Sequence, residues 1–344
     1  MYFKIKKTWR SYLLRKIAKF ILPLFLSISF LSGCGANAEV NGTNKEAAAN
    51  SSTTNAPKET TEPAAPEQTG YVPETLTVQF VPSQNADTLE AKAKPLEKLL
   101  TDQLGIPVKV SVSTDYNVII EAMASKKVDV GFLPPTAYVL AKEKGAAEVI
   151  LQAQRFGVQD DTGAPTDQLV DFYKSMIIVK KDPDIKTIAD LKGKRIAYQN
   201  VTSSAGFVWP AGKLMEAGLD PLKDVQAITV KGHDQGVLAV LNGDVDAAAI
   251  FQDARNVVKA DYPTVFEDTR VLAFTENIPN DTISVRSDMS QEWIEKIQNA
   301  FIAIGNDEAG HAIIKDIYSH EGYVKSEDSI FNIVREYGEK VKTE

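Results

Sequence analysis

Three consecutive hydroxyl residues, Thr202, Ser203 and Ser204, follow a short apolar segment in the second half of the chain. Residues 194–199 are typical of a buried strand, and a helix is predicted to run from the hydroxyl turn to Ala217. The first backbone N–H groups of a helix lack internal partners and lie at the positive end of the helix dipole. Hydroxyl and amide donors without a lysine or arginine therefore favour reversible binding of a tetrahedral oxyanion.

An ordinary Ser/Thr helix cap is the alternative interpretation of this turn, but one cap accounts for only one of the hydroxyls. Gly206 lets the backbone approach a ligand closely. Pro210 removes a helical hydrogen bond to Gly206, so the first turn of the helix is expected to be irregular.

A hydrolase is the rival function from another class, because Ser204, His233 and Asp253 could be taken as a catalytic triad. The turn does not match G-x-S-x-G, and the chain has neither of the glycine-rich phosphate-binding patterns of nucleotide-binding proteins. A binding protein is therefore favoured over an enzyme. With three His and one Cys, no Cys/His zinc site can form, and we expect no metal or cofactor.

The elements that must position these residues alternate between strands and helices over residues 75–344, in two similar cycles. Alternation of this kind predicts α/β lobes, each with a parallel sheet covered by helices, and a ligand cleft at the carboxyl ends of the strands. The predicted strands are 75–80, 107–113, 128–133, 148–156 and 173–181, followed by 194–199, 225–230 and 245–251. The predicted helices are 86–105, in which Pro95 either makes a kink or marks the true start, 115–127, 134–145, 187–193, the helix ending at Ala217, 233–243, 290–305 and 331–341.

The N-terminus has the features of a secretory signal. Residues 1–33 carry seven basic residues and no acid, and the apolar run 20–31 is too short to span a bilayer. The segment Leu31-Ser32-Gly33-Cys34 matches the bacterial lipobox, so we expect a signal peptide over 1–33 and lipidation of Cys34, with a buried helix and a chance Cys as the alternative. Residues 34–72 are predicted to be a disordered tether, because they contain almost no large apolar residue.

The charge of the remaining chain is strongly acidic. Loss of the seven basic residues in 1–33 changes the net charge from −8 to −15. Binding to nucleic acid requires clustered Lys and Arg, so we expect no nucleic-acid partner.

Three spaced segments resemble the phosphate/phosphite/phosphonate substrate-binding proteins of bacterial ABC importers: 115–141, 191–221 and 233–255. The resemblance implies a two-lobed type II periplasmic-binding-protein fold with two hinge crossings, which we place near Val179 and Val285. Lobe 1 would then comprise 73–178 and 286–344, and lobe 2 would comprise 179–285. It also implies an ABC permease as partner, and we expect a monomer anchored by its lipid at the extracytoplasmic face of the cell membrane.

The resemblance also implies the binding residues. The oxyanion would lie on Thr202, Ser203, Ser204 and Ala205; His233 would donate a hydrogen bond or carry compensating charge. Asp253 would accept a hydrogen bond from a protonated ligand and thereby reject sulfate, which is fully ionised. In the first lobe, Tyr116 would close over the ligand, with Tyr138 as a further candidate.

The ligand expected from these residues is small: phosphite, methylphosphonate or phosphate. An aminophosphonate is less favoured, because only Asp253 occupies a position suited to an ammonium group. Three alternatives stay open at this point, namely a tethered sensor, a sulfonate-binding protein and a binding protein for a thiamine-precursor pyrimidine.

Overall fold

The computed structural model describes residues 69–159, 164–181 and 184–342. The predicted signal peptide and Cys34 lie outside the described residues, as does most of the predicted tether. The end of that tether is folded, however: the backbone N–H of Tyr71 donates to Asp288 O at 2.7 Å, and Arg286 lies over the Tyr71 ring at 3.6 Å. The tether prediction was therefore wrong for Tyr71, whose aromatic ring stabilises the start of the folded unit.

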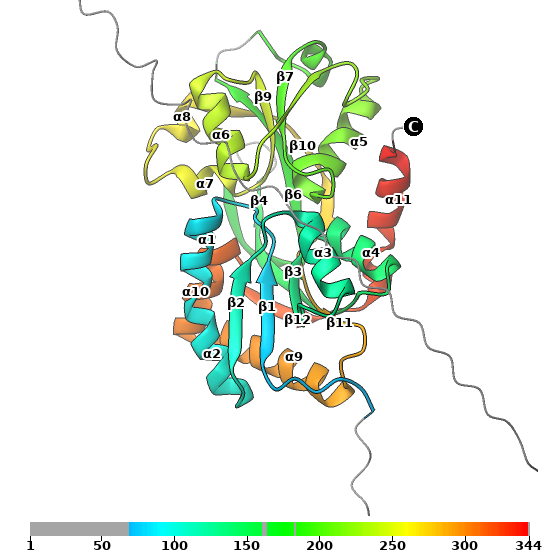
Figure 1. Ribbon diagram of the computed structural model, residues 1–344. Coiled ribbons are helices and arrows are strands. Elements are labelled where there is room, and N and C mark those ends of the chain that lie inside the picture. Colours follow the sequence, from blue (N-terminus) through cyan, green and yellow to red (C-terminus); the bar gives the residue numbers. More distant parts are fainter. Residues whose placement is uncertain (1–68, 160–163, 182–183, 343–344) are drawn as a thin grey trace, which may run out of the picture. The chain divides into compact units, whose positions relative to one another are not determined.

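The first sheet combines parallel and antiparallel strands in the order β12-β4-β11-β3-β1-β2, with β5 paired to β4 (Figure 1). Strand β1 pairs in parallel with β2 and β3, whereas β11 runs antiparallel to β3 and β4. The predicted parallel sheet was therefore wrong: β11 enters the sheet in the opposite direction on its return from the second lobe, and β5 and β12 also pair antiparallel with β4. The strands are β1 (Leu76–Phe80), β2 (Val108–Val112), β3 (Val130–Leu133), β4 (Ala147–Val158), β5 (Pro165–Val170), β11 (Thr282–Arg286) and β12 (Gly322–Lys325).

Local signals set the helix ends around this sheet. Pro95 is the first residue of α2, where its missing N–H is not needed, and Gly105 ends that helix with φ 72°. The Asp115 side chain caps α3 by accepting from Asn117 N at 2.7 Å. The helices are α1 (Ala86–Ala93), α2 (Pro95–Leu104), α3 (Tyr116–Ala124), α4 (Pro135–Glu143), α9 (Gln291–Asn306) and α10 (Glu308–Tyr318), with the 3-10 turn η3 (Asp328–Phe331).

The second sheet has the order β10-β6-β9-β7-β8 and is also mixed (Figure 1). Strand β7 is parallel to β8 and β9, and β6 is antiparallel to β9 and β10. Its strands are β6 (Phe172–Lys180), β7 (Arg195–Tyr198), β8 (Gln226–Thr229), β9 (Ala247–Phe251) and β10 (Thr269–Pro279). Its helices are η1 (Ile188–Leu191), η2 (Ser204–Val208), α5 (Trp209–Glu216), α6 (His233–Asn242), α7 (Ala254–Val258) and α8 (Val265–Asp268).

The chain crosses between the sheets at positions other than those predicted. It passes from β5 to β6 at Asp171 and returns from β10 to β11 at Asn280 and Asp281, and Asn280 N donates to Asp171 O at 2.8 Å. Val179 lies within β6, and Val285 lies within β11. The hinge positions and the lobe boundaries built on them are corrected accordingly, because apolar strand residues pair within a sheet while polar residues make the crossing.

The C-terminal helix α11 (Asn332–Val341) belongs to neither lobe alone, although 286–344 was assigned to lobe 1. It lies beside α4 and α5 (Figure 1). On the second lobe, the Tyr337 ring stacks on Trp209 with 4.5 Å between ring centroids. Just before α11, Phe331 packs edge-on against Tyr138 of α4 at 4.9 Å. The helix therefore contacts both lobes.

Candidate ligand-binding site

A buried cavity of about 40 Å³ lies where residues of both lobes meet. One water molecule needs about 10–15 Å³ on this measure, so the space suits a group of only a few heavy atoms. The lining residues are Val81, Ser83, Tyr116, Phe132, Pro134, Arg155, Tyr173, Ser203, Ala205, His233, Phe251, Asp281 and Tyr318.

The hydroxyl turn forms one wall of this cavity through Ser203 and Ala205. The Ser203 hydroxyl accepts from Gly206 N at 3.1 Å and donates to Gln199 Oε1 at 3.1 Å. The next five residues form a single π-helical turn, η2, before α5 begins at Trp209. This is the irregular first turn that Pro210 predicts.

Ser204 and Ala205 are the first two residues of η2. Backbone N–H groups at the start of a helical segment have no acceptor within the helix, so they can bind an anion. A Cβ on Gly206 would lie 2.6 Å from Gln199 Cβ and 2.8 Å from Ser203 Oγ. Glycine is therefore needed here for the close packing that holds the turn against β7.

The other two predicted hydroxyls do not line the cavity. Thr202 Oγ1 donates to Asn200 Oδ1 at 2.8 Å. Ser204 Oγ accepts from Thr136 N at 3.0 Å and lies 2.9 Å from Thr136 Oγ1. Because Thr136 is the second residue of α4 in the first lobe, the Ser204 hydroxyl connects the two lobes, and Ser204 is not among the residues that line the cavity.

His233 is the first residue of α6, and its side chain is 4% exposed. Its backbone N–H donates to Ser83 O at 2.9 Å, and its Nδ1 accepts from Phe251 N at 3.3 Å. The second bond places the ring proton on Nε2. Burial lowers the pKa of His233 to about 3, so the ring is a neutral donor and does not carry the compensating charge considered above.

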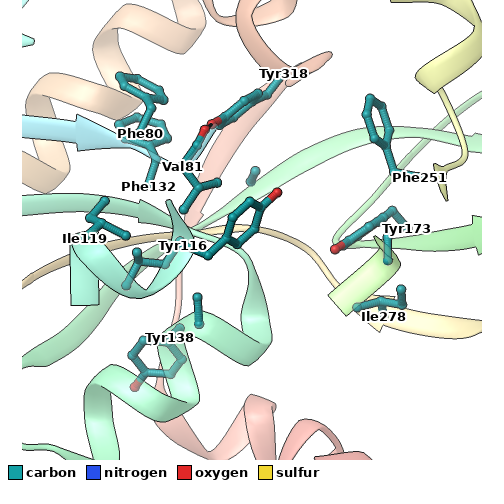
Figure 2. Close-up of a cluster of buried hydrophobic side chains, with 14 of the residues drawn as sticks. Phe80, Val81, Tyr116, Ile119, Phe132, Tyr138, Tyr173, Phe251, Ile278 and Tyr318 are labelled. Carbon is teal, nitrogen blue, oxygen red and sulfur yellow. Dashed lines mark hydrogen bonds between the residues drawn. The ribbon is translucent and has the colours of Figure 1, made fainter. Parts of the chain in front are cut away.

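Tyr116 and Tyr138 differ in their surroundings. Figure 2 shows the hydroxyls of Tyr116 and Tyr173 directed toward one another, whereas the Tyr138 hydroxyl points away. Tyr116 OH donates to Gln199 Oε1 at 3.3 Å across the lobes, and burial raises its pKa, which keeps it protonated. Tyr138 OH donates to Asp328 Oδ1 at 2.7 Å outside the cavity, so Tyr138 is not a ligand residue in this arrangement.

The carboxylate that lines the cavity is Asp281, whereas the sequence suggested Asp253. Asp253 Oδ2 lies 3.2 Å from Arg155 Nη1, and Asp281 Oδ2 lies 3.6 Å from Arg155 Nη2. Burial raises the pKa of Asp253, and the guanidinium opposes that effect. Asp253 is therefore paired with Arg155 and is not among the residues that line the cavity.

Several residues that line the cavity were not predicted from the sequence. For one of them, Ser83, the position after a strand could have indicated the site. Ser83 follows strand β1 at its carboxyl end, the location that the sheet rule favours for ligands, and its buried hydroxyl has no hydrogen-bond partner among the described residues. Asp281 lies at a chain crossing that was placed elsewhere. Arg155 and Tyr173 lie within or beside apolar strand segments, where sequence alone gives no sign of a site.

Ser204, His233 and Asp253 do not form a hydrolytic relay. The polar partners of their side chains are Thr136, Phe251 N and Arg155 respectively. The described residues contain no group of three His, Cys, Asp or Glu side chains that could hold a metal ion. In the same part of the chain, no helix is both long and apolar enough to cross a membrane.

A family model described as the periplasmic substrate-binding protein of phosphonate ABC transporters matches residues 78–331. The phosphate-import protein PhnD of Mycolicibacterium smegmatis is 29% identical over 245 residues, which cover 68% of this chain and 73% of that protein. The phosphonates-binding periplasmic protein of Escherichia coli is 25% identical over 244 residues, covering 70% of this chain and 69% of the relative.

The fold is shared with solved structures. That of PhnD1 from Prochlorococcus marinus in complex with methylphosphonate superposes with a TM-score of 0.64 at 19% identity, covering 78% of this chain and 98% of that chain. The expected two-lobed type II fold is thereby confirmed, and so is the family implied by the three sequence segments. The chain belongs to the periplasmic substrate-binding proteins of phosphonate ABC transporters, an extracytoplasmic family that binds substrates for import.

Proposed function

We propose that this protein binds a small phosphorus oxyanion, phosphite, methylphosphonate or phosphate, in the cavity between its lobes. The observation that carries the proposal is the convergence of uncharged polar groups on one cavity. The hydroxyls of Ser203 and Tyr116 donate to Gln199 Oε1 in this structure, and rotation about the C–O bond lets each donate to a ligand oxygen instead. Ser203, Ala205 and His233 come from the second lobe, and Tyr116 comes from the first. Fixed neutral dipoles in a buried site stabilise an anion without the cost of burying an unpaired cation.

The volume of the cavity restricts which ligands can bind. A cavity of about 40 Å³ accommodates an oxyanion of four or five heavy atoms but leaves little room for an alkyl chain. The lobes already make contact around it, since Asn200 Nδ2 donates to Asp115 Oδ2 at 2.7 Å and Asn85 N donates to Asp234 Oδ2 at 3.2 Å. Ligands with long substituents would keep these contacts from forming.

The protonation state of the ligand also determines whether it can bind. Asp281 faces the cavity and takes the role that sequence reasoning gave to Asp253. A phosphorus oxyanion that retains a P–OH can donate to this carboxylate, whereas sulfate cannot. Asp281 is partly buried, and a carboxylate shielded from water opposite a fully ionised anion is unfavourable, so we expect sulfate to be rejected.

Calorimetric titration with phosphite, methylphosphonate, phosphate, 2-aminoethylphosphonate and sulfate tests the proposal. The first three should bind, with the thermal unfolding temperature rising as each ligand approaches saturation. Sulfate and the aminophosphonate should bind at least tenfold more weakly, which corresponds to about 1.4 kcal/mol. Binding of sulfate as tight as that of every phosphorus compound would contradict the proposed site.

We also propose that the protein acts as a monomer anchored to the membrane through lipidated Cys34. The match of residues 31–34 to the bacterial lipobox supports lipid anchoring. Expression in a bacterial host should place the wild-type protein in the membrane fraction, and Cys34→Ser should release it. Retention of Cys34→Ser in the membrane would contradict lipid anchoring.

A further inference from the structure

Arg155 is a buried cation shared between two carboxylates at one end of the cavity. Its side chain is 3% exposed, and it lies in β4 of the first lobe. Asp253 of the second lobe lies 3.2 Å from Nη1, and Asp281 at the chain crossing lies 3.6 Å from Nη2. Nε donates to Asn280 Oδ1 at 3.1 Å, and the guanidinium packs over the Tyr173 ring at 4.9 Å. These contacts fix the guanidinium in one position.

The charge of this cluster is set by its members. One cation and two carboxylates sum to −1, and the nearby His320 ring, 3.5 Å from Asp281, stays neutral because burial lowers its pKa. Glu321, which follows His320, is paired with Lys315 at 2.7 Å. Asp281 lines the cavity and Asp253 does not, but both carboxylates would attract a cation, and Arg155 already occupies the position between them.

We propose that Arg155, held by Asp253 and Asp281, is a specificity-determining residue that excludes ligands carrying an ammonium group and accepts monoanionic oxyanions. This inference rests on the proposed function and deepens it. An ammonium group on the ligand would have to displace the guanidinium from its two carboxylates. A second negative charge on the ligand would be repelled by Asp281. Arg155 would not offset this repulsion, because its charge is already balanced by Asp253 and Asp281.

Arg155→Ala tests the exclusion of ammonium groups. The substitution removes the cation and opens space between Asp253 and Asp281, so a ligand ammonium can take its place. In calorimetric titrations, the ratio of 2-aminoethylphosphonate to methylphosphonate affinity should rise at least 100-fold over wild type. Arg155→Lys is the matched control, because it keeps the charge and should keep the wild-type preference. An unchanged ratio in a folded Arg155→Ala variant would overturn the proposal.

Asp253→Asn is a nearly isosteric change that tests the net charge of the cluster formed by Arg155, Asp253 and Asp281. It also tests the proposed role of this cluster if Arg155→Ala does not fold. Neutralising Asp253 leaves Arg155 paired with Asp281 alone, so the cluster carries no net charge. Sulfate affinity should then rise at least tenfold relative to methylphosphonate. An unchanged sulfate preference in Asp253→Asn would overturn the role of the cluster.

The two proposals fail in different ways. If wild-type protein binds none of phosphite, methylphosphonate and phosphate, the proposed function is wrong. If wild-type protein binds them and either folded variant keeps the wild-type selectivity, only the role of Arg155 and its two carboxylates is wrong.

Discussion

The two walls of the cavity present different kinds of polar group to an anion, uncharged on one side and charged on the other. The donor wall, formed by Ser203, Ala205 and His233, is uncharged and comes entirely from the second lobe. The charged wall is formed by Arg155 and Asp281; Asp253 of the second lobe pairs with Arg155 without lining the cavity, so the three side chains join both lobes and neutralise most of their own charge. The difference indicates that attraction and selection are separate: neutral donors bind the oxyanion, and the charged wall decides which oxyanion is accepted.

The energies of the two walls support this division. A neutral hydrogen bond contributes about 0.5–1.5 kcal/mol, so losing one weakens binding modestly. Removing one partner from a buried ion pair costs about 3–5 kcal/mol, because a charge is left without compensation. Changes to the donor wall should therefore alter affinity for all ligands alike, whereas changes to the charged wall should alter the order of preference.

The largest effect on the donor wall is expected from Gly206→Ala. A methyl group there would lie 2.6 Å from Gln199 Cβ, so the turn must move. We expect affinity for methylphosphonate to fall about 100-fold and stability to fall by about 1–3 kcal/mol, as measured by calorimetry and thermal unfolding. Gly338→Ala in α11 is the matched control, because a Cβ at this position would meet nothing within 4 Å. It should lower neither the affinity nor the stability. Wild-type affinity in Gly206→Ala would contradict the assigned turn.

The next effect concerns the charge state of His233. Its pKa of about 3 lies below the unfolded value, so the unfolded chain takes up a proton that the folded protein does not. Stability should therefore fall as the pH falls below about 6.5, by about 1.4 kcal/mol per pH unit from this residue. His320 contributes in the same direction. The pH dependence of unfolding in His233→Gln isolates the contribution of His233, because His320 is common to both proteins. Identical slopes would show that His233 is not held neutral by burial.

A smaller effect is expected from Ser203→Ala. The substitution removes a hydroxyl that lines the cavity and also accepts from Gly206 N. Affinity should fall about tenfold, equivalent to about 1.4 kcal/mol, for phosphite, methylphosphonate and phosphate alike. A change in the ranking of these ligands would contradict the separation of the two walls.

The smallest effects are expected from a matched pair of tyrosine variants. Tyr116→Phe removes a hydroxyl that bonds Gln199 across the lobes, so affinity should fall a few-fold, or about 1 kcal/mol. Tyr138→Phe should leave affinity unchanged and lower stability slightly, because its hydroxyl bonds Asp328 outside the cavity. Equal loss of affinity in the two variants would remove the distinction between the two tyrosines.

Local signals predicted much of the fold. The cap at Asp115, the start of α2 at Pro95 and its end at Gly105 depend only on neighbouring residues, and each was visible in the sequence. The antiparallel strands β10 and β11 were missed because their pairing depends on distant segments: β10 pairs with β6, and β11 pairs with β3 and β4. The hinge was misplaced for the same reason.

The same distinction between local and distant signals applies to the candidate site. Ser203, His233 and Tyr116 stand at helix starts, where exposed backbone donors and strand ends make a ligand site predictable. The partner of Asp253 could not be predicted, since Arg155 lies 98 residues away within a strand. A carboxylate at a strand end does not reveal whether it faces the ligand or an arginine.

A crystal structure of the protein with bound methylphosphonate tests the central claim most directly. The phosphonate oxygens should lie within hydrogen-bond distance of Ser203 Oγ, the Ala205 backbone N–H and His233 Nε2, with Arg155 still paired to Asp253 and Asp281. A phosphonate held instead by the Arg155 guanidinium, with the two carboxylates turned away and the hydroxyl turn unoccupied, would contradict the account.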